Sequence, residues 1–316
     1  MSSVNEKKIP LVVIVGPTAV GKTETALILA ERMQGEIISS DSRLFYRGMD
    51  IGTAKPTSTE LLRVPHHLID VTNPDLTWSL AHFQAEAQRV ILDIHQRGKL
   101  PFLVGGTGQY LRAVSEGWSL PHQEPNPRLR QLLEAWGNQI GYQALHAKLA
   151  LIDSAAAVFI DASNMRRTIR ALEVIFMTGR RFSEQRQRGE SPYNLLTLGL
   201  TRPRPELYER IDARIQLMLA SGWLEEVCGL LARGYSPELP SMSAIGYKQL
   251  AAHLRGEMTQ EEAVVQIKRL TRVFVRRQAN WFSENDPHIH WFRSGEGAAP
   301  QMETLVRQFL EEQEQP

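Results

Sequence analysis

Apolar runs alternate with amphipathic segments in the first part of the chain. Short blocks of consecutive apolar residues are separated by longer stretches in which apolar positions recur every three or four residues. The blocks predict buried strands and the stretches predict helices, a pattern typical of a parallel sheet with crossover helices. The expected strands are Pro10 to Val15, Glu36 to Ser40, a fainter one at His67 to Val71, Leu100 to Val104, and Leu195 to Leu200 as a later return to the sheet.

A proline-rich passage from Pro121 to Pro127 ends this alternation, and the segment from Arg128 to Arg188 has helical periodicity. We therefore expect an α/β protein into which a helical subdomain is inserted. The expected organisation is a core formed by residues 1–116 and 191–316, with the inserted subdomain at 117–190.

Three later segments predict helices that combine an apolar face with arginines on another face. They run from a cap at Asn164 to Gly179, from Pro205 to Ser221, and from Gln260 to Phe282. Their apolar positions are Ile169, Leu172 and Phe176, then Leu207, Ile211, Ile215 and Met218, then Val264, Ile267, Leu270 and Phe274.

The most informative motif follows the first expected strand. It matches the signature G-x-x-x-x-G-K-[ST] and precedes an expected helix from Thr23 to Met33. In this arrangement backbone N–H groups turn toward a phosphate, the helix adds the positive end of its dipole, and the lysine adds a cation. The motif predicts diphosphate binding and a P-loop NTPase-like sheet, with Mg²⁺ on the Thr23 hydroxyl; a glycine-rich turn that matches by chance is the alternative. Its residues are Gly16, Pro17, Thr18, Ala19, Val20, Gly21, Lys22 and Thr23.

Two further loops follow expected strands, at Asp41 and at Gly105 to Gly108. Because the carboxyl ends of parallel strands meet at one edge of a sheet, these loops and the glycine-rich motif should form one cleft. Asp41 is a candidate proton acceptor or an outer partner of Mg²⁺, and its alternative is an aspartate that caps the next turn. Thr107 is a candidate donor to a diphosphate oxygen, although its glycine-rich surroundings also fit a tight connection.

The composition limits the kinds of protein that this chain can be. The chain has 316 residues, of which 42% are hydrophobic and 22% charged, as expected for a folded protein with an ample core. Its apolar runs are far shorter than the ~18 residues of a membrane span and its start lacks a signal-peptide core, so we expect a cytoplasmic protein with no membrane association. The single cysteine, Cys228, allows no internal disulfide and is expected to be buried in a helix.

Charge is unevenly distributed, although the formal net charge is only +1. Two arginine-rich clusters fit contacts to a nucleic-acid backbone, and Tyr247, Trp281 and His67 offer rings on which a base could stack. Solvated helix faces and core aromatics are the alternatives. The clusters comprise Arg166, Arg167, Arg170, Arg180, Arg181, Arg186 and Arg188, then Lys268, Arg269, Arg272, Arg276 and Arg277.

With these residues in place, the chain resembles the tRNA dimethylallyltransferases. The resemblance covers most of the chain, and its blocks follow one another in the family's order. They are Gly16 to Thr23, Asp41 to Arg43, Tyr46 to Pro56, His66 to Asp70, Val104 to Tyr110, Arg167 to Val174, Ala244 to Lys248, and Arg276 to Phe282.

The resemblance implies transfer of a dimethylallyl group from dimethylallyl diphosphate to N6 of the adenine just 3′ of the anticodon, in tRNAs that read codons starting with U. It implies that Asp41 removes the proton from this amine, which is a poor nucleophile because its lone pair is delocalised into the ring. It also places Thr23 and Arg214 on the diphosphate. The implied cofactor is Mg²⁺, the implied partner is the tRNA anticodon stem-loop, and we expect a monomer.

The same resemblance implies which residues contact the RNA. The target adenine would leave its stack and enter the cleft. The matching positions are Asp41, Ser42, Arg43 and Leu44 around the adenine, Thr107 and Arg130 at the tRNA, and Arg166, Arg167, Thr168, Ile169, Arg170, Ser243, Ala244, Ile245, Gly246, Tyr247, Lys248, Arg276, Arg277, Gln278 and Trp281 along the stem-loop.

Three other functions fit part of the pattern. An adenylate isopentenyltransferase would keep the phosphate motif and Asp41 but would not need the two arginine clusters. A small-molecule kinase and a nucleotide-controlled RNA-binding switch are allowed by the phosphate motif alone.

Overall fold

The computed structural model describes residues 8–120, 126–185 and 189–314. The chain divides into two compact units, one formed by residues 1–115 with 191–316 and the other by residues 116–190. Arg186, Arg188 and residues 121–125 of the proline-rich passage lie outside the described residues.

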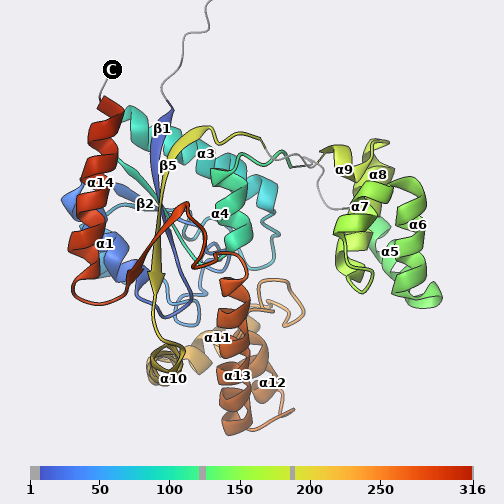
Figure 1. The fold of residues 1–316 in the computed structure, drawn as a ribbon. Coiled ribbons are helices and arrows are strands. Elements are labelled where there is room, and N and C mark those ends of the chain that lie inside the picture. Colours follow the sequence, from blue (N-terminus) through green and yellow to red (C-terminus); the bar gives the residue numbers. More distant parts are fainter. Residues whose placement is uncertain (1–7, 121–125, 186–188, 315–316) are drawn as a thin grey trace, which may run out of the picture. The chain divides into compact units, whose positions relative to one another are not determined.

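The first unit contains a six-stranded parallel sheet with the strand order β3-β2-β4-β1-β5-β6 (Figure 1). The central strand, β1, pairs with β4 on one side and with β5 on the other, although β5 lies far along the chain. The predicted α/β fold with a parallel sheet is therefore confirmed. The strands are β1 (Ile9–Val15), β2 (Glu36–Ser39), β3 (His66–His67), β4 (Pro101–Val104), β5 (Tyr193–Thr201) and β6 (Ile289–Arg293).

Helices cover both faces of this sheet, because successive side chains of a strand point to opposite faces. Val12 and Ile14 of β1 pack in one apolar cluster with residues of α1 and α14, whereas Leu11 and Val13 pack in another with residues of α3 and α4. Figure 1 shows these two helix pairs on opposite sides of the strands. The helices of this unit are α1 (Lys22–Arg32), α2 (Ser58–Arg63), α3 (Leu80–Gln96), α4 (Gly108–Ser115), α10 (Arg204–Ala220), α11 (Trp223–Ala232), α12 (Tyr247–Leu254), α13 (Gln260–Ala279) and α14 (Ala298–Glu314).

The second unit is helical, as predicted, and packs around its own apolar cluster, which includes Leu133, Leu145 and Leu172. The Asn164 side chain accepts a hydrogen bond from the Arg167 N–H, and Gly179 takes a left-handed conformation, so the predicted start and end of α8 are confirmed. Its helices are α5 (Pro127–Ile140), α6 (Tyr142–Ile152), α7 (Ser154–Phe159), α8 (Met165–Thr178) and α9 (Phe182–Gln185).

Several expectations about bounds and burial are wrong. The strand expected at His67 to Val71 stops at His67, since Leu68 and Asp70 have φ of 60° and 55°, which an extended strand does not allow. The helix expected to reach Phe282 ends at Ala279. The remaining errors concern residues expected to be buried but exposed in the structure, which are Phe176, Phe274 and Cys228.

Several elements have no counterpart among the expected ones, among them β6, α12 and α14. Strand β6 lies at the edge of the sheet and is only partly buried, so it lacks the continuous apolar run of a central strand. Helix α14 covers the sheet beside α1 and carries Met302, Val306 and Phe309 on its buried side. Both follow the segment that the sequence indicated as the last long helix.

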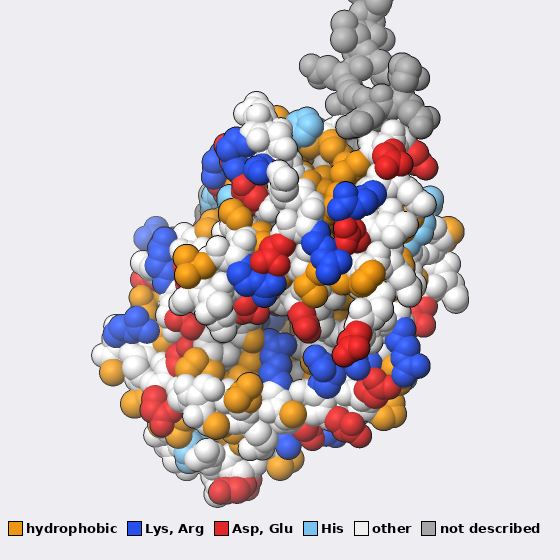
Figure 2. Space-filling model, turned by 90° about the vertical axis from the view of Figure 1, so that its left-hand side faces the viewer, with side chains coloured by type: hydrophobic (Ala, Val, Ile, Leu, Met, Phe, Trp, Pro, Cys, Tyr) orange, Lys and Arg blue, Asp and Glu red, His pale blue; other side chains and the backbone are white. Residues whose placement is uncertain are grey.

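The molecular surface mixes charges of both signs. On the face shown in Figure 2, Lys and Arg side chains are interspersed with Asp and Glu, in keeping with the small net charge. Within residues 8–120, 126–185 and 189–314, no single helix has the length and apolarity of a membrane span; the pair α10 and α11, bent by 56°, reaches that threshold only jointly.

Candidate active site

The site is built around the phosphate loop, Gly16 to Thr23, which connects β1 to α1. Gly16 has a φ of 150°, and a Cβ there would lie 2.6 Å from the Leu200 carbonyl oxygen, so glycine is required. The Lys22 Nζ donates to the Gly16 and Pro17 carbonyl oxygens at 2.9 and 2.8 Å. The Ser294 hydroxyl donates to the Val20 carbonyl oxygen at 2.5 Å, which ties the loop to the segment after β6.

Two adjoining cavities share part of their walls at this loop. The first, of about 490 Å³, is lined by Lys22, Thr23 and Gly105 and Gly106 of the glycine turn, which we define as Gly105 to Gly108. The second, of about 350 Å³, is lined by Thr107 and by apolar side chains. Asp41 and Arg214 line both cavities. The three loops predicted to converge therefore do so, and the apolar side chains of the second cavity include Ile211, Ile215, Trp223, Ile267 and Phe274.

Two cations, Lys22 and Arg214, lie close to Asp41 at the site. Burial lowers the pKa of the Lys22 ammonium to about 8; the nearby Asp41 carboxylate raises this pKa and the Arg214 guanidinium lowers it further. Burial also lowers the pKa of Arg214, against the attraction of Asp41. Lys22 and Arg214 are therefore two poorly solvated cations that a bound anion would stabilise; the first cavity is also lined by the acids Glu24 and Glu60.

Asp41 caps a turn and also lines both cavities. Its Oδ1 accepts a hydrogen bond from the Arg43 backbone N–H at 3.0 Å, so it does cap the turn that follows β2. Its carboxylate also lines both cavities. The Arg43 guanidinium donates to the carbonyl oxygens of Pro240 and Ser241 at 3.1 and 3.3 Å, which joins this turn to the segment before α12.

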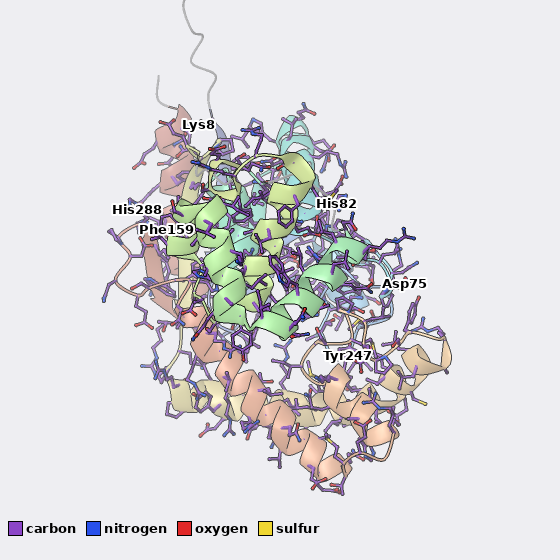
Figure 3. The ribbon with its side chains drawn as sticks, turned by 90° about the vertical axis from the view of Figure 1, so that its right-hand side faces the viewer. Lys8, Asp75, His82, Phe159, Tyr247 and His288 are labelled. Atoms are coloured by element: carbon purple, nitrogen blue, oxygen red, sulfur yellow. The ribbon has the colours of Figure 1, made fainter. Side chains whose placement is uncertain are left out.

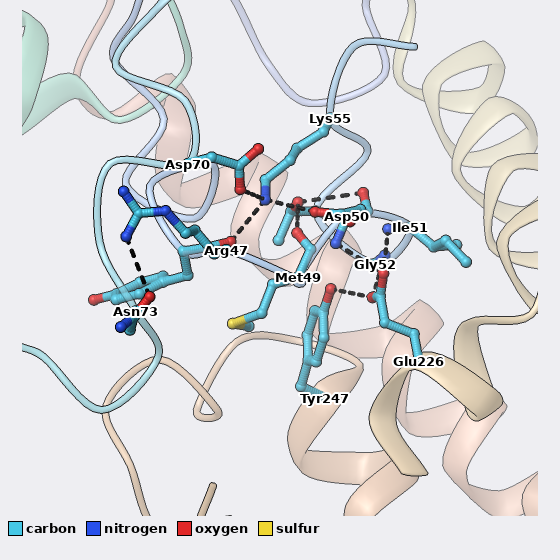
Figure 4. A network of polar contacts seen from close by, with 12 residues as sticks. Arg47, Met49, Asp50, Ile51, Gly52, Lys55, Asp70, Asn73, Glu226 and Tyr247 are labelled. Atoms are coloured by element: carbon cyan, nitrogen blue, oxygen red, sulfur yellow. Dashed lines mark hydrogen bonds and ion pairs between the residues drawn. The ribbon is translucent and has the colours of Figure 1, made fainter. Parts of the chain in front are cut away.

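One wall of the cavities is held by the network around Glu226 (Figure 4). The Glu226 carboxylate accepts hydrogen bonds from the backbone N–H groups of residues 50, 51 and 52 at 2.8, 2.7 and 3.3 Å. It also accepts one from the Tyr247 hydroxyl at 2.6 Å. Because Thr53, next in the chain, lines both cavities, this network sets the position of their wall.

Two of the three rings proposed for base stacking are engaged elsewhere. Tyr247, on α12 (Figure 3), is fully buried, and its pKa is raised by burial and by Glu226. His67 pairs with Glu36 at 2.7 Å at the edge of the sheet. Stacking on Tyr247 was a wrong expectation, because its ring is fully buried, whereas His67 is partly exposed and stacking on it stays a prediction. Trp281 remains partly accessible.

The residues that the family resemblance places at the RNA fall into an exposed group and a buried group. In the second unit Arg166 and Arg167 are exposed, whereas Arg130 and Arg170 pair with the buried Glu173 at 2.9 and 2.7 Å. Burial would raise the pKa of Glu173, but hydrogen bonds from these arginines and from the Asn126 N–H outweigh it and lower that pKa. Others in the set are exposed, namely Ser243, Lys248, Arg276 and Arg277. Several are buried, namely Thr168, Ile169, Ala244, Gly246, Tyr247 and Gln278.

Sequence reasoning missed three features of the site. Arg210 lines the first cavity, and its Nε donates to the Ala19 carbonyl oxygen at 2.9 Å. Arg210 lies one turn before Arg214 on α10, and this spacing indicated that the two arginines face the same site. Glu226 and Phe274 had no such signal, because they resembled a solvated acid and a core residue.

Comparisons with known proteins agree with this geometry. The sequence model of the family described as IPP transferase matches residues 44–285, which is most of the chain. A tRNA dimethylallyltransferase of Roseiflexus sp. (strain RS-1) is 50% identical over 303 residues, covering 96% of this chain and 99% of the relative. One from Thermomicrobium roseum is 49% identical over 90% of this chain and 87% of the relative.

Solved structures give the same result. The full-length tRNA isopentenylpyrophosphate transferase of Bacillus halodurans is 45% identical, with a TM-score of 0.73, and the match covers 97% of this chain and 98% of that chain. A eukaryotic dimethylallyltransferase described as acting on tRNA is 26% identical, with a TM-score of 0.83, over 96% of this chain and 80% of that chain. Because the family model matches residues 44–285 and relatives are about half identical over most of its length, the chain belongs to the IPP transferase family.

Proposed function

We propose that this protein transfers a dimethylallyl group from dimethylallyl diphosphate to N6 of the adenosine immediately 3′ of the anticodon, in tRNAs that read codons starting with U. The observation that carries the proposal is the placement of Asp41 and Arg214 in the shared wall of a phosphate-loop cavity and a largely apolar cavity. The names of the relatives support a tRNA acceptor over a free nucleotide.

The phosphate loop and its cations suit diphosphate as a leaving group. As the bond between the allylic carbon and the diphosphate oxygen breaks, negative charge grows on that oxygen. Lys22, Arg214 and the loop N–H groups are fixed near the place where this charge develops, and such preorganised groups stabilise a transition state more than a ground state. Their poor solvation strengthens the effect, since a low dielectric weakens electrostatic interactions less than water does.

Asp41 is the proposed base for the acceptor amine. The carboxylate would take one N6 proton as the new carbon–nitrogen bond forms, so the product leaves as a neutral secondary amine. The second cavity offers apolar walls for a flat base or an isoprenoid group, and Thr107 offers a hydroxyl for orientation.

The residues at the site also fit Mg²⁺. The Thr23 hydroxyl stands in the first turn of α1 and lines the first cavity. The described residues contain no group of three or more His, Cys, Asp or Glu side chains placed to hold a metal ion. Mg²⁺ commonly takes few protein ligands together with waters and substrate phosphates, so Thr23 with a diphosphate is a suitable set. When bound, the ion would neutralise charge on the leaving group.

A direct assay tests the proposed function. The protein is incubated with labelled dimethylallyl diphosphate, Mg²⁺ and unmodified tRNA, and the nucleosides are then analysed. We expect labelled N6-dimethylallyladenosine from the tRNA and none from free AMP, ADP or ATP. Label on a free nucleotide alone would establish an adenylate isopentenyltransferase, and phosphoryl transfer from ATP would establish a kinase.

Diphosphate affinity should fall as the pH rises through about 8, where Lys22 loses its proton. A lysine whose pKa is lowered by burial is charged below that pKa and neutral above it, and a neutral amine does not attract an anion. Calorimetric titration with inorganic diphosphate across this pH range measures the effect. The same titration of the Lys22→Met variant should give a weaker affinity without this transition, and an unchanged transition would contradict the assignment to Lys22.

Arg276→Glu should weaken tRNA binding and reduce its salt dependence, because fewer counterions are released when a phosphate contact is lost. Arg276 is exposed near the end of α13. Filter binding or anisotropy at several salt concentrations measures both quantities. Arg89→Glu, on the exposed face of α3 and outside the implied RNA blocks, is the matched control and should leave both unchanged. Equal salt slopes in the two variants would exclude Arg276 from the RNA interface.

We also propose that the protein acts as a monomer in the cytoplasm, where tRNA is modified. Sedimentation with and without tRNA checks the monomeric state.

A further inference from the structure

Gln278 lies in the last turn of α13 and makes two hydrogen bonds inside the protein. Its side-chain carbonyl, Oε1, accepts from the Thr18 backbone N–H of the phosphate loop at 2.8 Å. Its side-chain amide, Nε2, donates to the Gly106 carbonyl oxygen of the glycine turn at 3.1 Å. The residue is only 6% exposed. One side chain therefore bridges the two loops that frame the first cavity.

The surrounding residues allow this bridge to form. A Cβ at Gly106 would lie 2.3 Å from the Gln278 amide nitrogen, so glycine at this position lets the amide approach the turn. Trp281 packs against Gly108 just as closely, and its carbonyl oxygen accepts from the Arg112 guanidinium at 2.6 Å. The end of α13 is thus fastened to the glycine turn at two points.

The residues next to Gln278 in the chain differ from it in solvent exposure. Arg276 and Arg277 are exposed, whereas Gln278 is buried and its two polar groups already have partners inside the protein. The family resemblance placed all three at the RNA. For Gln278 the structure contradicts a direct contact, because a buried amide that left these partners would strand the Thr18 N–H and the Gly106 carbonyl oxygen.

We propose that Gln278 is a positioning residue for the diphosphate: it fixes the phosphate loop and the glycine turn at the spacing that the leaving group requires. The hydrogen bond from the Thr18 N–H to Oε1 fixes the peptide group that precedes Thr18, next to Ala19, which has a left-handed φ of 66°. The identity of the diphosphate-bearing donor rests on the proposed function, whereas the binding of diphosphate at this site does not.

The test compares Gln278→Met with Arg277→Met by titrating each with inorganic diphosphate and Mg²⁺, and separately with a synthetic anticodon stem-loop RNA. Methionine keeps the length of the glutamine and removes both hydrogen bonds. We expect Gln278→Met to bind diphosphate about tenfold more weakly and the RNA as tightly as the unmodified protein. Arg277→Met, as the matched control, should show the opposite pattern. In the transferase assay, the KM for dimethylallyl diphosphate should rise in Gln278→Met and the KM for tRNA should not.

Two more variants separate positioning from a general loss of structure. Gln278→Glu keeps the acceptor for the Thr18 N–H but cannot donate to Gly106 and adds a negative charge, so it should bind diphosphate more weakly than Gln278→Met. Gly106→Ala keeps the glutamine but places a methyl group against its amide, and should weaken diphosphate binding at unchanged RNA affinity. A lower melting temperature with unchanged diphosphate affinity in all three variants would overturn the proposal, as would weaker RNA binding with unchanged diphosphate affinity. If the wild-type protein binds diphosphate but does not prenylate tRNA, the proposed function fails while this comparison still stands.

Discussion

Replacing Asp41 by alanine should slow prenyl transfer about 10²–10⁴-fold, the range expected when a general base is lost, while tRNA binding persists. The acceptor amine must lose a proton as it forms its new bond, and Asp41 is the carboxylate that lines both cavities. The readout is single-turnover transfer from labelled dimethylallyl diphosphate, with RNA binding measured in parallel. Saturating concentrations of both substrates separate the chemical step from binding.

Asp41→Asn serves as the matched variant, because Asp41 also caps the turn at Arg43 through Oδ1. An asparagine keeps an oxygen acceptor for this cap but cannot take the proton. If Asp41 is the base, both variants lose activity to a similar extent. An active asparagine variant beside an inactive alanine variant would show that Asp41 only shapes the turn. Since Asp41 raises the pKa of Lys22, the assays belong well below pH 8, where the lysine stays charged without its neighbour.

Arg214→Met should reduce kcat about 10²–10³-fold, comparable to the loss of one preorganised donor in an oxyanion site. Arg214 lines both cavities and is poorly solvated, so its charge acts on the leaving group with little screening by water. Methionine preserves most of the side chain's volume and removes only the charged head. The rate and the KM for dimethylallyl diphosphate are measured at saturating tRNA.

Arg89→Met, on the surface of α3, is the control for loss of one positive charge and should match the unmodified protein. A second comparison uses Arg210→Met, since Arg210 holds the Ala19 carbonyl oxygen and shapes the loop. We expect it to raise the KM for the donor more than it lowers kcat. A full kcat in Arg214→Met with a raised KM would mean that Arg214 contributes only to ground-state binding.

The parts of the site that follow strands were predictable from the sequence. The phosphate loop, Asp41 and the glycine turn each come directly after an apolar run, and the geometry of a parallel sheet brings such loops to one edge. The caps of α8 were predictable for a similar reason, because Asn164 and Gly179 act on backbone groups close to them in sequence. Local rules were sufficient for all of these residues.

The residues that support the site were not predictable in this way. Glu226 binds three backbone N–H groups more than 170 positions away, and Gln278 reaches 260 positions back to Thr18. In the sequence each is one polar residue on an amphipathic helix, where solvent exposure is the usual outcome. Phe274 was assigned to the core by its helical spacing, yet it lines a cavity. Periodicity identifies a helix face, but the partner of that face depends on the tertiary structure.

The supports of the phosphate loop also have a consequence for biosynthesis. The loop leaves the ribosome long before Gln278 and Ser294, which hold Thr18 and Val20 and follow them by 260 and 274 positions. A nascent chain therefore carries the complete motif long before it can stabilise the motif's shape. Contacts of such long sequence separation form slowly, so ligand binding is acquired only after the segment that carries Gln278 and Ser294 has been translated.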